Sequence, residues 1–230
     1  MSSQVAAMWV DLFPVLLAMA VSPVRTLAAI LFLYAPRGVA TALSFVLGMV
    51  VATLLQGVFV GVGLSAVGLT GSTRSSDLAV VVGTLYLAGG VILIGGAFKF
   101  ATAPATGSGS LGSALERLER MEPRGSFKIG FGWMLASPKQ WVFVLEAVAV
   151  IYTAELRPIG SLVHYFGFAI LVQIVYLIII AAYAMARDRV SPGLDTFFAW
   201  IRTNLRVTAT GLFTVFGIAF LVKGLSELAG

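Results

Sequence analysis

The sequence predicts an all-α polytopic membrane protein with six transmembrane helices arranged as two inverted three-helix repeats. Three observations predict it: an apolar composition, six long apolar segments, and a motif that occurs twice at half the chain length. Of 230 residues, 59% are apolar and 11% are charged, and the mean hydropathy is +1.00. A soluble domain carries about 25% charged residues. Lipid is therefore the expected solvent for most of this chain.

Six segments are long and apolar enough to cross a bilayer, which takes about 20 residues. They lie near Met8–Leu33, Val39–Leu64, Leu78–Phe98, Phe127–Tyr152, Leu162–Ala186 and Leu205–Leu225. Turn residues separate several of them, at Ala35–Gly38, Thr70–Arg74 and Arg157–Pro158. The segments are also rich in glycine, with a Gly57–Gly61 pair and five glycines in the third segment. Small residues let helix backbones approach closely in lipid, so a compact bundle is expected.

The basic residues predict the orientation. In a six-helix arrangement, ten of the 15 Lys and Arg residues fall in the loops after the first, third and fifth helices, and three fall on the other side. The basic side is cytoplasmic, so both termini are expected outside a cytoplasmic membrane that the chain crosses several times. Residues 1–7 contain no Lys or Arg. A cleavable signal peptide begins with a basic region, so the first segment is interpreted as a membrane helix.

Three parts are expected along the chain: a first repeat over residues 1–98, a cytoplasmic linker over 99–126, and a second repeat over 127–230. The linker begins with a Gly- and Ser-rich stretch that is typical of flexible chains. Ser113 and Glu116 then form a capping-box pattern. It predicts a short amphipathic helix on the cytoplasmic interface, or alternatively a partner-binding helix. Its apolar face holds Leu111, Leu115, Leu118 and Met121. A second interfacial stretch, Leu194–Ile201, carries Phe197, Phe198 and Trp200.

The duplicated motif is Met19–Arg25 (MAVSPVR) against Met134–Gln140 (MLASPKQ), with an offset of 115 residues. Each copy lies in the first helix of a three-helix half. Because three is odd, the second half must be inverted relative to the first. Inverted repeats are typical of secondary transporters, which bind substrate where broken helices of the two halves meet. Ser22-Pro23 and Ser137-Pro138 are therefore the expected breaks, because proline removes a backbone donor and frees a carbonyl.

The residues around the breaks form the candidate substrate or transport path: Ser22, Pro23, Arg25, Ser137, Pro138, Lys139, Gln140 and Glu146. The serines either bond back to the freed carbonyls or contact a ligand. Lys139 lies about 18 Å into its helix, near mid-membrane, where a cation is unfavourable by about 2.5–3.5 kcal/mol. We expect it and Arg25 to face one cavity and bind an anionic headgroup. Glu146, two turns further on, is a counter-ion, a proton-coupling group or an interfacial acid.

Composition excludes several other classes of protein. The chain has no cysteine and one histidine, His164, so neither a thiolate nucleophile nor a His/Cys metal site is expected. No nucleophile–base pair is evident, and no P-loop is present, so the chain is predicted not to be an enzyme and to need no cofactor. Its basic residues lie in loops between apolar segments, which argues against nucleic-acid binding.

The two-half architecture, with each half opening at a Ser-Pro break, resembles the LysE superfamily of membrane exporters. Within it, Ser22-Pro23-Val24-Arg25, Ala35-Pro36-Arg37 and Gly48 are similar to the actinobacterial peptidoglycolipid and sulfolipid addressing proteins, the GAP family. The second motif in that family usually contains Asn-Pro-Lys, and Pro138 and Lys139 match it while Ser137 replaces the asparagine. Ser22 stands where an aspartate is often found. Both departures remove a polar anchor.

The resemblance implies export: small cationic or amino-acid-like solutes in the wider superfamily, and cell-envelope glycolipids in the GAP branch. Three hypotheses stay open. The protein is an exporter of an envelope glycolipid or lipid-linked anionic molecule, an ion-gradient-driven exporter of a small solute, or a non-transporting scaffold. Expected partners are a membrane lipid or small-molecule substrate, a second copy in a homodimer, or the machinery of envelope-lipid synthesis and export. A sealed polar pocket would favour a small solute, and a groove open to lipid would favour a lipid.

Overall fold

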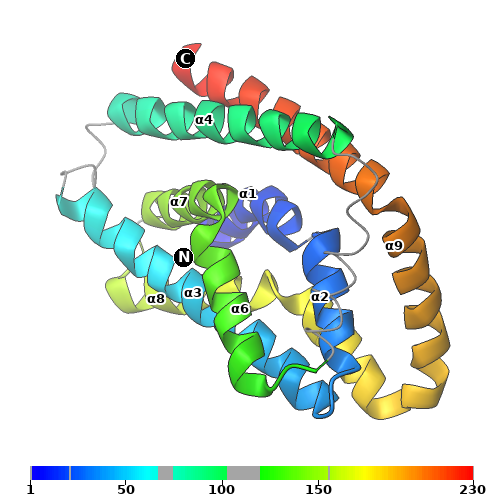
Figure 1. Ribbon diagram of the computed structural model, residues 1–230. Coiled ribbons are helices and arrows are strands. Elements are labelled where there is room, and N and C mark those ends of the chain that lie inside the picture. The colour runs from blue at the N-terminus through cyan, green and yellow to red at the C-terminus, as the bar shows by residue number, and fades with distance from the viewer. Residues whose placement is uncertain (1, 21, 67–74, 103–119, 155, 230) are drawn as a thin grey trace.

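The computed structural model describes residues 2–20, 22–66, 75–102, 120–154 and 156–229. Within these ranges the chain is helical, without strands (Figure 1). The helices are α1 (Ser2–Ala20), α2 (Pro23–Leu33), α3 (Gly38–Ala66), α4 (Ser75–Thr102), α6 (Pro123–Ala136), α7 (Pro138–Thr153), α8 (Pro158–Leu171) and α9 (Ile174–Ala229). Two predicted features, the amphipathic helix around Leu111–Leu118 and the turn at Thr70–Arg74, lie outside the described residues.

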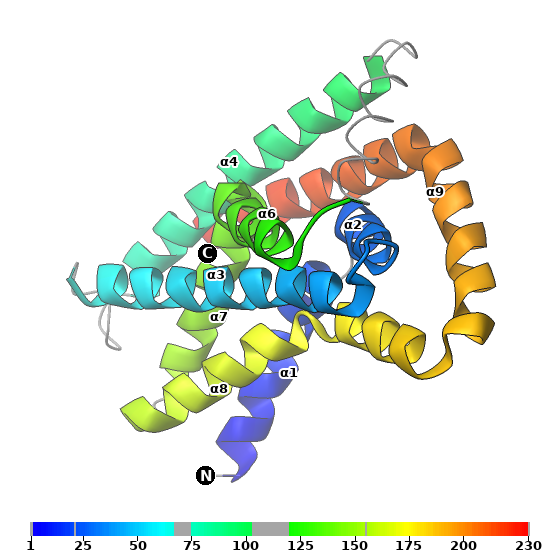
Figure 2. The ribbon, with the colours of Figure 1, turned by 60° about the horizontal axis from the view of Figure 1, so that its bottom comes forward.

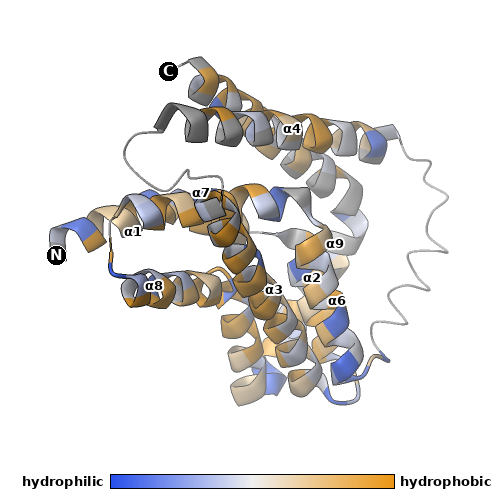
Figure 3. Cartoon of the chain, turned by 90° about the vertical axis from the view of Figure 1, so that its left-hand side faces the viewer, coloured by the Kyte–Doolittle hydropathy of each residue, from blue (hydrophilic) through white to orange (hydrophobic). Residues whose placement is uncertain are grey.

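Length and apolarity identify candidate membrane spans among the described helices. Two qualify alone, Ser3–Ala20 and Gly38–Ser65, and up to four qualify if each of two bent pairs is one span. The bent pairs are α6 with α7 and the joined α8 and start of α9. Shorter apolar helices occur at Val24–Leu33, Tyr86–Lys99 and Phe213–Ser226. The chain is thus an all-helical membrane protein, and α3 is apolar along its length (Figure 3).

Both predicted Ser-Pro breaks are present. α1 ends at Ala20 and α2 begins at Pro23, while Ser22 is extended with φ −143° and ψ 104°. α6 ends at Ala136 and α7 begins at Pro138, with Ser137 at φ −88° and ψ 110°. The bend between α6 and α7 is 74°. Each proline occupies the first turn of the following helix, where its missing N–H removes no helical bond.

Two features of the structure bear on the predicted fifth segment, Leu162–Ala186. First, it is broken at Val172–Gln173, where α8 meets α9 at 55°. Second, α9 continues as helix through the expected interfacial stretch Leu194–Ile201, with a non-helical residue at Ala186. Neither Pro nor Gly stands at Val172–Gln173, so no local residue indicated that break. Pro192 lies six residues after the kink and does not end the helix.

Glycines set the closest helix contacts, as expected for packing in lipid. A Cβ at Gly48 would collide with the α6 backbone at Phe127, and one at Gly130 would collide with the α3 backbone at Phe45. α4 packs antiparallel to the last part of α9 through Gly83, Gly90, Gly217 and Gly224. Figures 1 and 2 show these two helices side by side, with the rest of α9 curving around the bundle. Of the predicted Gly57–Gly61 pair, only Gly57 makes a close contact, with the Tyr165 ring.

Two buried apolar clusters form the interior. The first gathers residues of α1, α7 and α8 with single residues of α3 and α9 and two of α4. The second gathers residues of α2, α3 and α6 with the start of α9. Met19 belongs to the first cluster and Met134 to the second. The two methionines each lie three residues before a Ser-Pro break, so the breaks lie where the two clusters adjoin.

Candidate functional site

The last carbonyls of α1 are each bonded by a side chain from a different helix. Lys139 of α7 donates to Ala18 O at 3.1 Å. Arg25 of α2 donates to Met19 O, and Tyr176 of α9 donates to Ala20 O at 3.0 Å. A helix end buried in lipid needs such donors, because no water is present to bond its free carbonyls. The first break is therefore closed by residues from three other helices.

Two cations meet at this point without a carboxylate between them. Arg25 is 3% exposed, and its guanidinium lies 5.8 Å from the centre of the Tyr176 ring. Lys139 Nζ lies 4.1 Å from the centre of the Phe216 ring. The C-terminus of α1 carries a partial negative charge equivalent to about half an elementary charge. That charge and the two aromatic faces stabilise the cations.

The end of α6 is bonded by neutral groups instead. Gln56 Nε2 of α3 donates to Met134 O at 3.1 Å, and Trp141 Nε1 donates to Leu135 O at 2.8 Å. Arg25 Nη1 and Gln140 Nε2 both approach the Met134 sulfur, at 3.5 Å and 3.3 Å. Arg25 and Gln140 are 115 residues apart, so equivalent positions of the two motifs converge on one atom. The two Ser-Pro motifs thus meet in space.

The serines do not close the breaks. Neither the Ser22 nor the Ser137 side chain caps the helix that follows it. Some buried amide atoms near the breaks have no hydrogen-bond partner, namely Gln56 Oε1 and both polar atoms of Gln173. Gln173 lies at the break between α8 and α9 and is fully buried. The polar groups at this crossing are thus only partly satisfied.

Glu146 lies away from the crossing, in a separate chamber of about 220 Å³ bounded by α1, α4, α7 and α9. Its carboxylate accepts a hydrogen bond from Tyr86 of α4 and pairs with Lys223 of α9. The ion-pair partner that the structure shows for Glu146 is Lys223. Lys139 lies next to the chamber but outside it. Its ammonium group contacts the Phe143 and Phe216 rings, which form part of the chamber wall.

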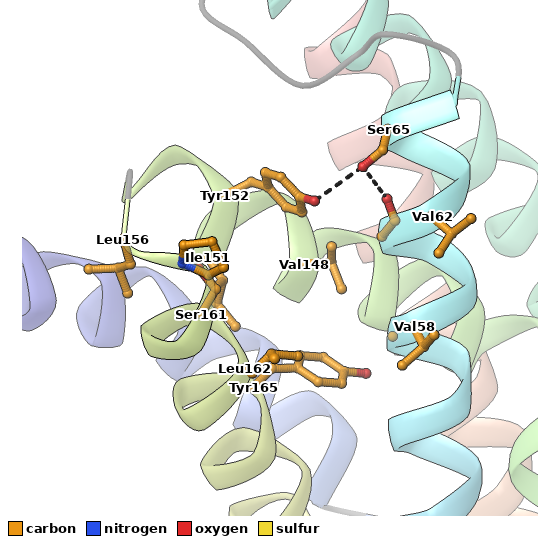
Figure 4. A pocket seen from close by; sticks show the side chains of 13 residues that line it. Val58, Val62, Ser65, Val148, Ile151, Tyr152, Leu156, Ser161, Leu162 and Tyr165 are labelled. Atoms are coloured by element: carbon orange, nitrogen blue, oxygen red, sulfur yellow. Dashed lines mark hydrogen bonds between the residues drawn. The ribbon is translucent and has the colours of Figure 1, made fainter.

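A second hollow, of about 760 Å³, opens between α3, α7 and α8 (Figure 4). Its walls are mainly apolar, with Val58 and Val62 from α3, Val148 and Ile151 from α7, and Leu162 from α8. Val58, Val62 and Leu162 are 58–65% exposed, so the hollow is open at the side of the bundle. We refer to it as the lateral groove. Its volume falls within the range of about 300–1,000 Å³ that ligand pockets occupy.

Polar groups gather at one end of the lateral groove. Ser65 lies in the last turn of α3, Tyr152 lies near the end of α7, and Ser161 lies in the first turn of α8. The Ser65 and Tyr152 hydroxyls are 3.3 Å apart (Figure 4). Arg157 is exposed in the turn before α8, between the groove-lining residues Leu156 and Pro158. At the other end, Tyr165 packs on Gly57 and donates to Thr53 O at 2.7 Å. The groove is therefore polar at the helix ends and apolar toward the middle of the bundle.

The fold and these sites define a polytopic helical membrane protein with broken helices and a side-opening apolar groove. The family model SfLAP, described as Sap, sulfolipid-1-addressing protein, matches residues 12–226. This chain belongs to that family, which confirms the addressing-protein resemblance. It is accordingly a membrane protein associated with sulfolipid addressing. No curated protein and no solved structure matches the chain.

The structure brings Arg25, Lys139 and Gln140 together with the two Ser-Pro breaks, and it places Glu146 in the neighbouring chamber. Sequence reasoning missed the residues that complete these sites: Tyr86, Trp141 and Met134, and the partner role of Lys223. Lys223 is the one cation in the last apolar segment after Arg206 at its start, which is the sequence signal that could have indicated it. The lateral groove had no sequence indication, because it is a gap between three helices. No group of His, Asp and Glu suited to a metal occurs in the described ranges.

Proposed function

We propose that this protein moves an anionic envelope glycolipid across the cytoplasmic membrane, with the acyl chains in the lateral groove. The observation that carries this proposal is the groove itself: about 760 Å³, mainly apolar, and open at the side of the bundle. A small polar solute gains little from such walls, whereas an acyl chain entering from the bilayer matches them. The family description, sulfolipid-1-addressing protein, supports the same class of substrate.

The polarity gradient along the groove suggests how the lipid lies. Hydroxyls of Ser65, Tyr152 and Ser161 mark the end near the helix termini, and Arg157 lies between two groove-lining residues. A sulfated or phosphorylated headgroup is stabilised at that end, since arginine offers a bidentate donor to such anions. The acyl chains then extend toward Gly57 and Tyr165. In the predicted orientation this end faces outward, which places the groove on the release side.

The reciprocal bonds at the breaks support the inverted-repeat architecture that transport requires. Gln56, in the second segment of the first half, bonds the end of α6 in the second half. Tyr176, in the second segment of the second half, bonds the end of α1 in the first half. A pseudo-two-fold axis relates such exchanges. We therefore propose six spans in two repeats, residues 1–98 and 127–230 joined by the linker 99–126, with both termini outside. This is also the arrangement that the LysE resemblance implies.

Flipping of a fluorescent lipid in proteoliposomes tests the proposal. The probe is NBD-labelled sulfatide, with NBD-galactosylceramide as the neutral counterpart, and dithionite quenching reports the leaflet. Gly61 lines the groove and a Cβ there meets nothing within 4 Å, so Gly61→Trp fills the groove without a backbone clash. Gly63 has equal space but lies outside the groove, so Gly63→Trp is the matched control.

The expected result is faster flipping of sulfatide than of the neutral lipid by the wild type. Gly61→Trp should lower the sulfatide rate by about tenfold or more, as expected when about 1.4 kcal/mol of binding is lost. Gly63→Trp should match the wild type. Equal rates for all three proteins would contradict a lipid path through the groove. Wild-type vesicles that flip neither lipid would favour the scaffold hypothesis.

A further inference from the structure

Glu146 connects α7 to two other helices, α4 and α9. On α7, its carboxylate accepts the Tyr86 hydroxyl from α4 and pairs with Lys223 from α9. The Glu146 side chain is 14% exposed, whereas that of Lys223 is 43% exposed. The acid is therefore the enclosed member of the pair, and the lysine can reach water. A single carboxylate thus holds side chains from two helices at once.

The two helices that contact Glu146, α4 and α9, pack very closely against each other. Gly83 and Gly90 of α4 face Gly224 and Gly217 of α9, so closely that a Cβ at any of the four positions would meet the opposing helix. Packing this tight resists sliding or separation of the two helices. We call α4 and the part of α9 after Phe213 the α4–α9 pair. Any change at Glu146 therefore acts on the pair as a whole.

The chamber at Glu146 is a small hollow that is open at its edge, where its lining residue Lys223 is exposed. α1 contributes Pro14, Val15 and Ala18 to its walls, none of which titrates. The charged or titratable groups seen to contact Glu146 include Tyr86 from α4 and Lys223 from α9. Lys139, on α7 itself, lies behind the Phe143 and Phe216 wall. Lys223 is thus the cation that lines the chamber with Glu146.

Protonation of Glu146 would remove the attachment. The proton adds to a carboxylate oxygen, Lys223 keeps its own proton, and only hydrogen bonds change. A neutral carboxyl no longer balances Lys223, and a charge without a partner in a bundle is unfavourable. Lys223 is already partly exposed and gains hydration by moving outward, carrying the α4–α9 pair with it. Deprotonation restores the pair and closes the chamber.

The same helix borders the lateral groove. Phe143 and Glu146 face the chamber, whereas Val148, Ile151 and Tyr152 face the groove. A movement of α7 relative to the α4–α9 pair therefore changes the wall of the lipid path. We propose that Glu146 is a proton-binding site through which the protein exchanges a proton for its lipid. This inference rests on the proposed function. One proton per lipid would support about tenfold accumulation per pH unit.

Distance measurements test the conformational part without transport. The natural chain lacks cysteine, so pairs of introduced cysteines carry spin labels at defined positions. Val80→Cys on α4 with Thr153→Cys on α7 reports the opening, and both positions are exposed. Val80→Cys with Val215→Cys reports the distance within the α4–α9 pair and serves as the control. Electron–electron resonance is recorded in lipid nanodiscs between pH 8 and pH 5.

The α4–α7 distance should lengthen at low pH in the wild-type background and stay long at both pH values in Glu146→Gln. The control distance should stay constant. In Lys223→Met the α4–α7 distance should also stay long at both pH values, because the carboxylate has lost the lysine with which it pairs. Glu122→Gln, at an exposed acid before α6, should behave as the wild type. A wild-type distance that does not change with pH, or a Glu146→Gln protein that keeps the wild-type response, overturns the proposal.

Proteoliposomes with NBD-sulfatide test the coupling. A gradient of two pH units should change the wild-type rate, and the ratio of rates with and without the gradient should fall to about 1 in Glu146→Gln. A wild type that flips sulfatide equally with and without the gradient overturns proton exchange and leaves the lipid path standing. A wild type that does not flip sulfatide removes the proposed function. Spin-label distances then still decide whether Glu146 fastens the helices.

Discussion

The two helix breaks share a Ser-Pro sequence and an extended serine, but they differ in what bonds their carbonyls. Two cations and a tyrosine bond the end of α1. A glutamine and a tryptophan bond the end of α6. Arg25 and Gln140 occupy equivalent positions of the two motifs. Lys139 belongs to the second motif, yet it bonds a carbonyl at the first break. Two breaks with the same Ser-Pro sequence thus differ in the charge of the groups that bond them.

This asymmetry has a mechanical consequence. Hydrogen bonds from charged donors contribute about 1.5–3 kcal/mol, against about 1 kcal/mol for neutral ones. The end of α1 is therefore held more firmly than the end of α6. The side chain that bonds Met134 O also leaves its own Oε1 without a hydrogen-bond partner. We infer that the α6–α7 break is the one that rearranges during transport, while the α1–α2 break stays fixed.

Arg25→Met should give the largest loss of stability. It leaves Met19 O without its donor in a buried site, so the free energy of unfolding should fall by about 2 kcal/mol. Gln140→Met, at the equivalent position, removes only a contact with the Met134 sulfur and should change it by less than about 0.5 kcal/mol. Reversible unfolding in bicelles measures both. Equal losses would remove the asymmetry between the breaks.

Lys139→Met should rank second. The variant loses a charged donor to Ala18 O and the contact with the Phe216 ring. It also removes repulsion between two nearby cations, so we expect a net loss of about 1 kcal/mol. The same bicelle experiment measures it. If Lys139→Met were more stable than the wild type, the lysine would be an uncompensated charge, and a ligand anion would be the better explanation of its position.

Tyr176→Phe and Gln56→Leu compare the neutral donors of the two breaks, and neither effect should exceed that of Lys139→Met. Tyr176→Phe leaves Ala20 O unbonded and should lower stability by about 1 kcal/mol, in the upper part of the range for hydrogen bonds in membrane helices. Gln56→Leu also loses a bond, but it removes the unpartnered Oε1, so its net effect should stay below about 0.5 kcal/mol. A larger loss for Gln56→Leu would show that the second break is the firmer one.

Local chemistry explains which features the sequence predicted. Pro23 and Pro138 interrupt apolar segments, and proline dictates a break wherever it follows such a run. Gly83 and Gly90 likewise indicated the close packing of α4. The break at Val172–Gln173 has no such residue, and it arises where α8 and α9 turn around the end of α1. Sequence spacing therefore predicted two of the three breaks.

Long-range partners were beyond sequence reasoning. Glu146 and Lys223 are 77 residues apart, and only the packing of α4 on α9 brings Lys223 to the carboxylate. Tyr176 reaches Ala20 O across 156 residues. The lateral groove depends on how α3, α7 and α8 diverge, which no residue pattern encodes. Residue types thus indicated the charged sites, while the fold determined their partners and the groove.

Photo-crosslinking of a lipid tests the central claim, that the lateral groove holds an acyl chain, most directly. A sulfatide with a diazirine near the end of its acyl chain is incorporated into nanodiscs with the protein, irradiated, and mapped by mass spectrometry. The account predicts labelling concentrated on Val58–Val62 of α3 and Val148–Ile151 of α7, lost in Gly61→Trp and kept in Gly63→Trp. Labelling spread evenly over the exposed faces, or concentrated on the α4–α9 pair, would contradict it.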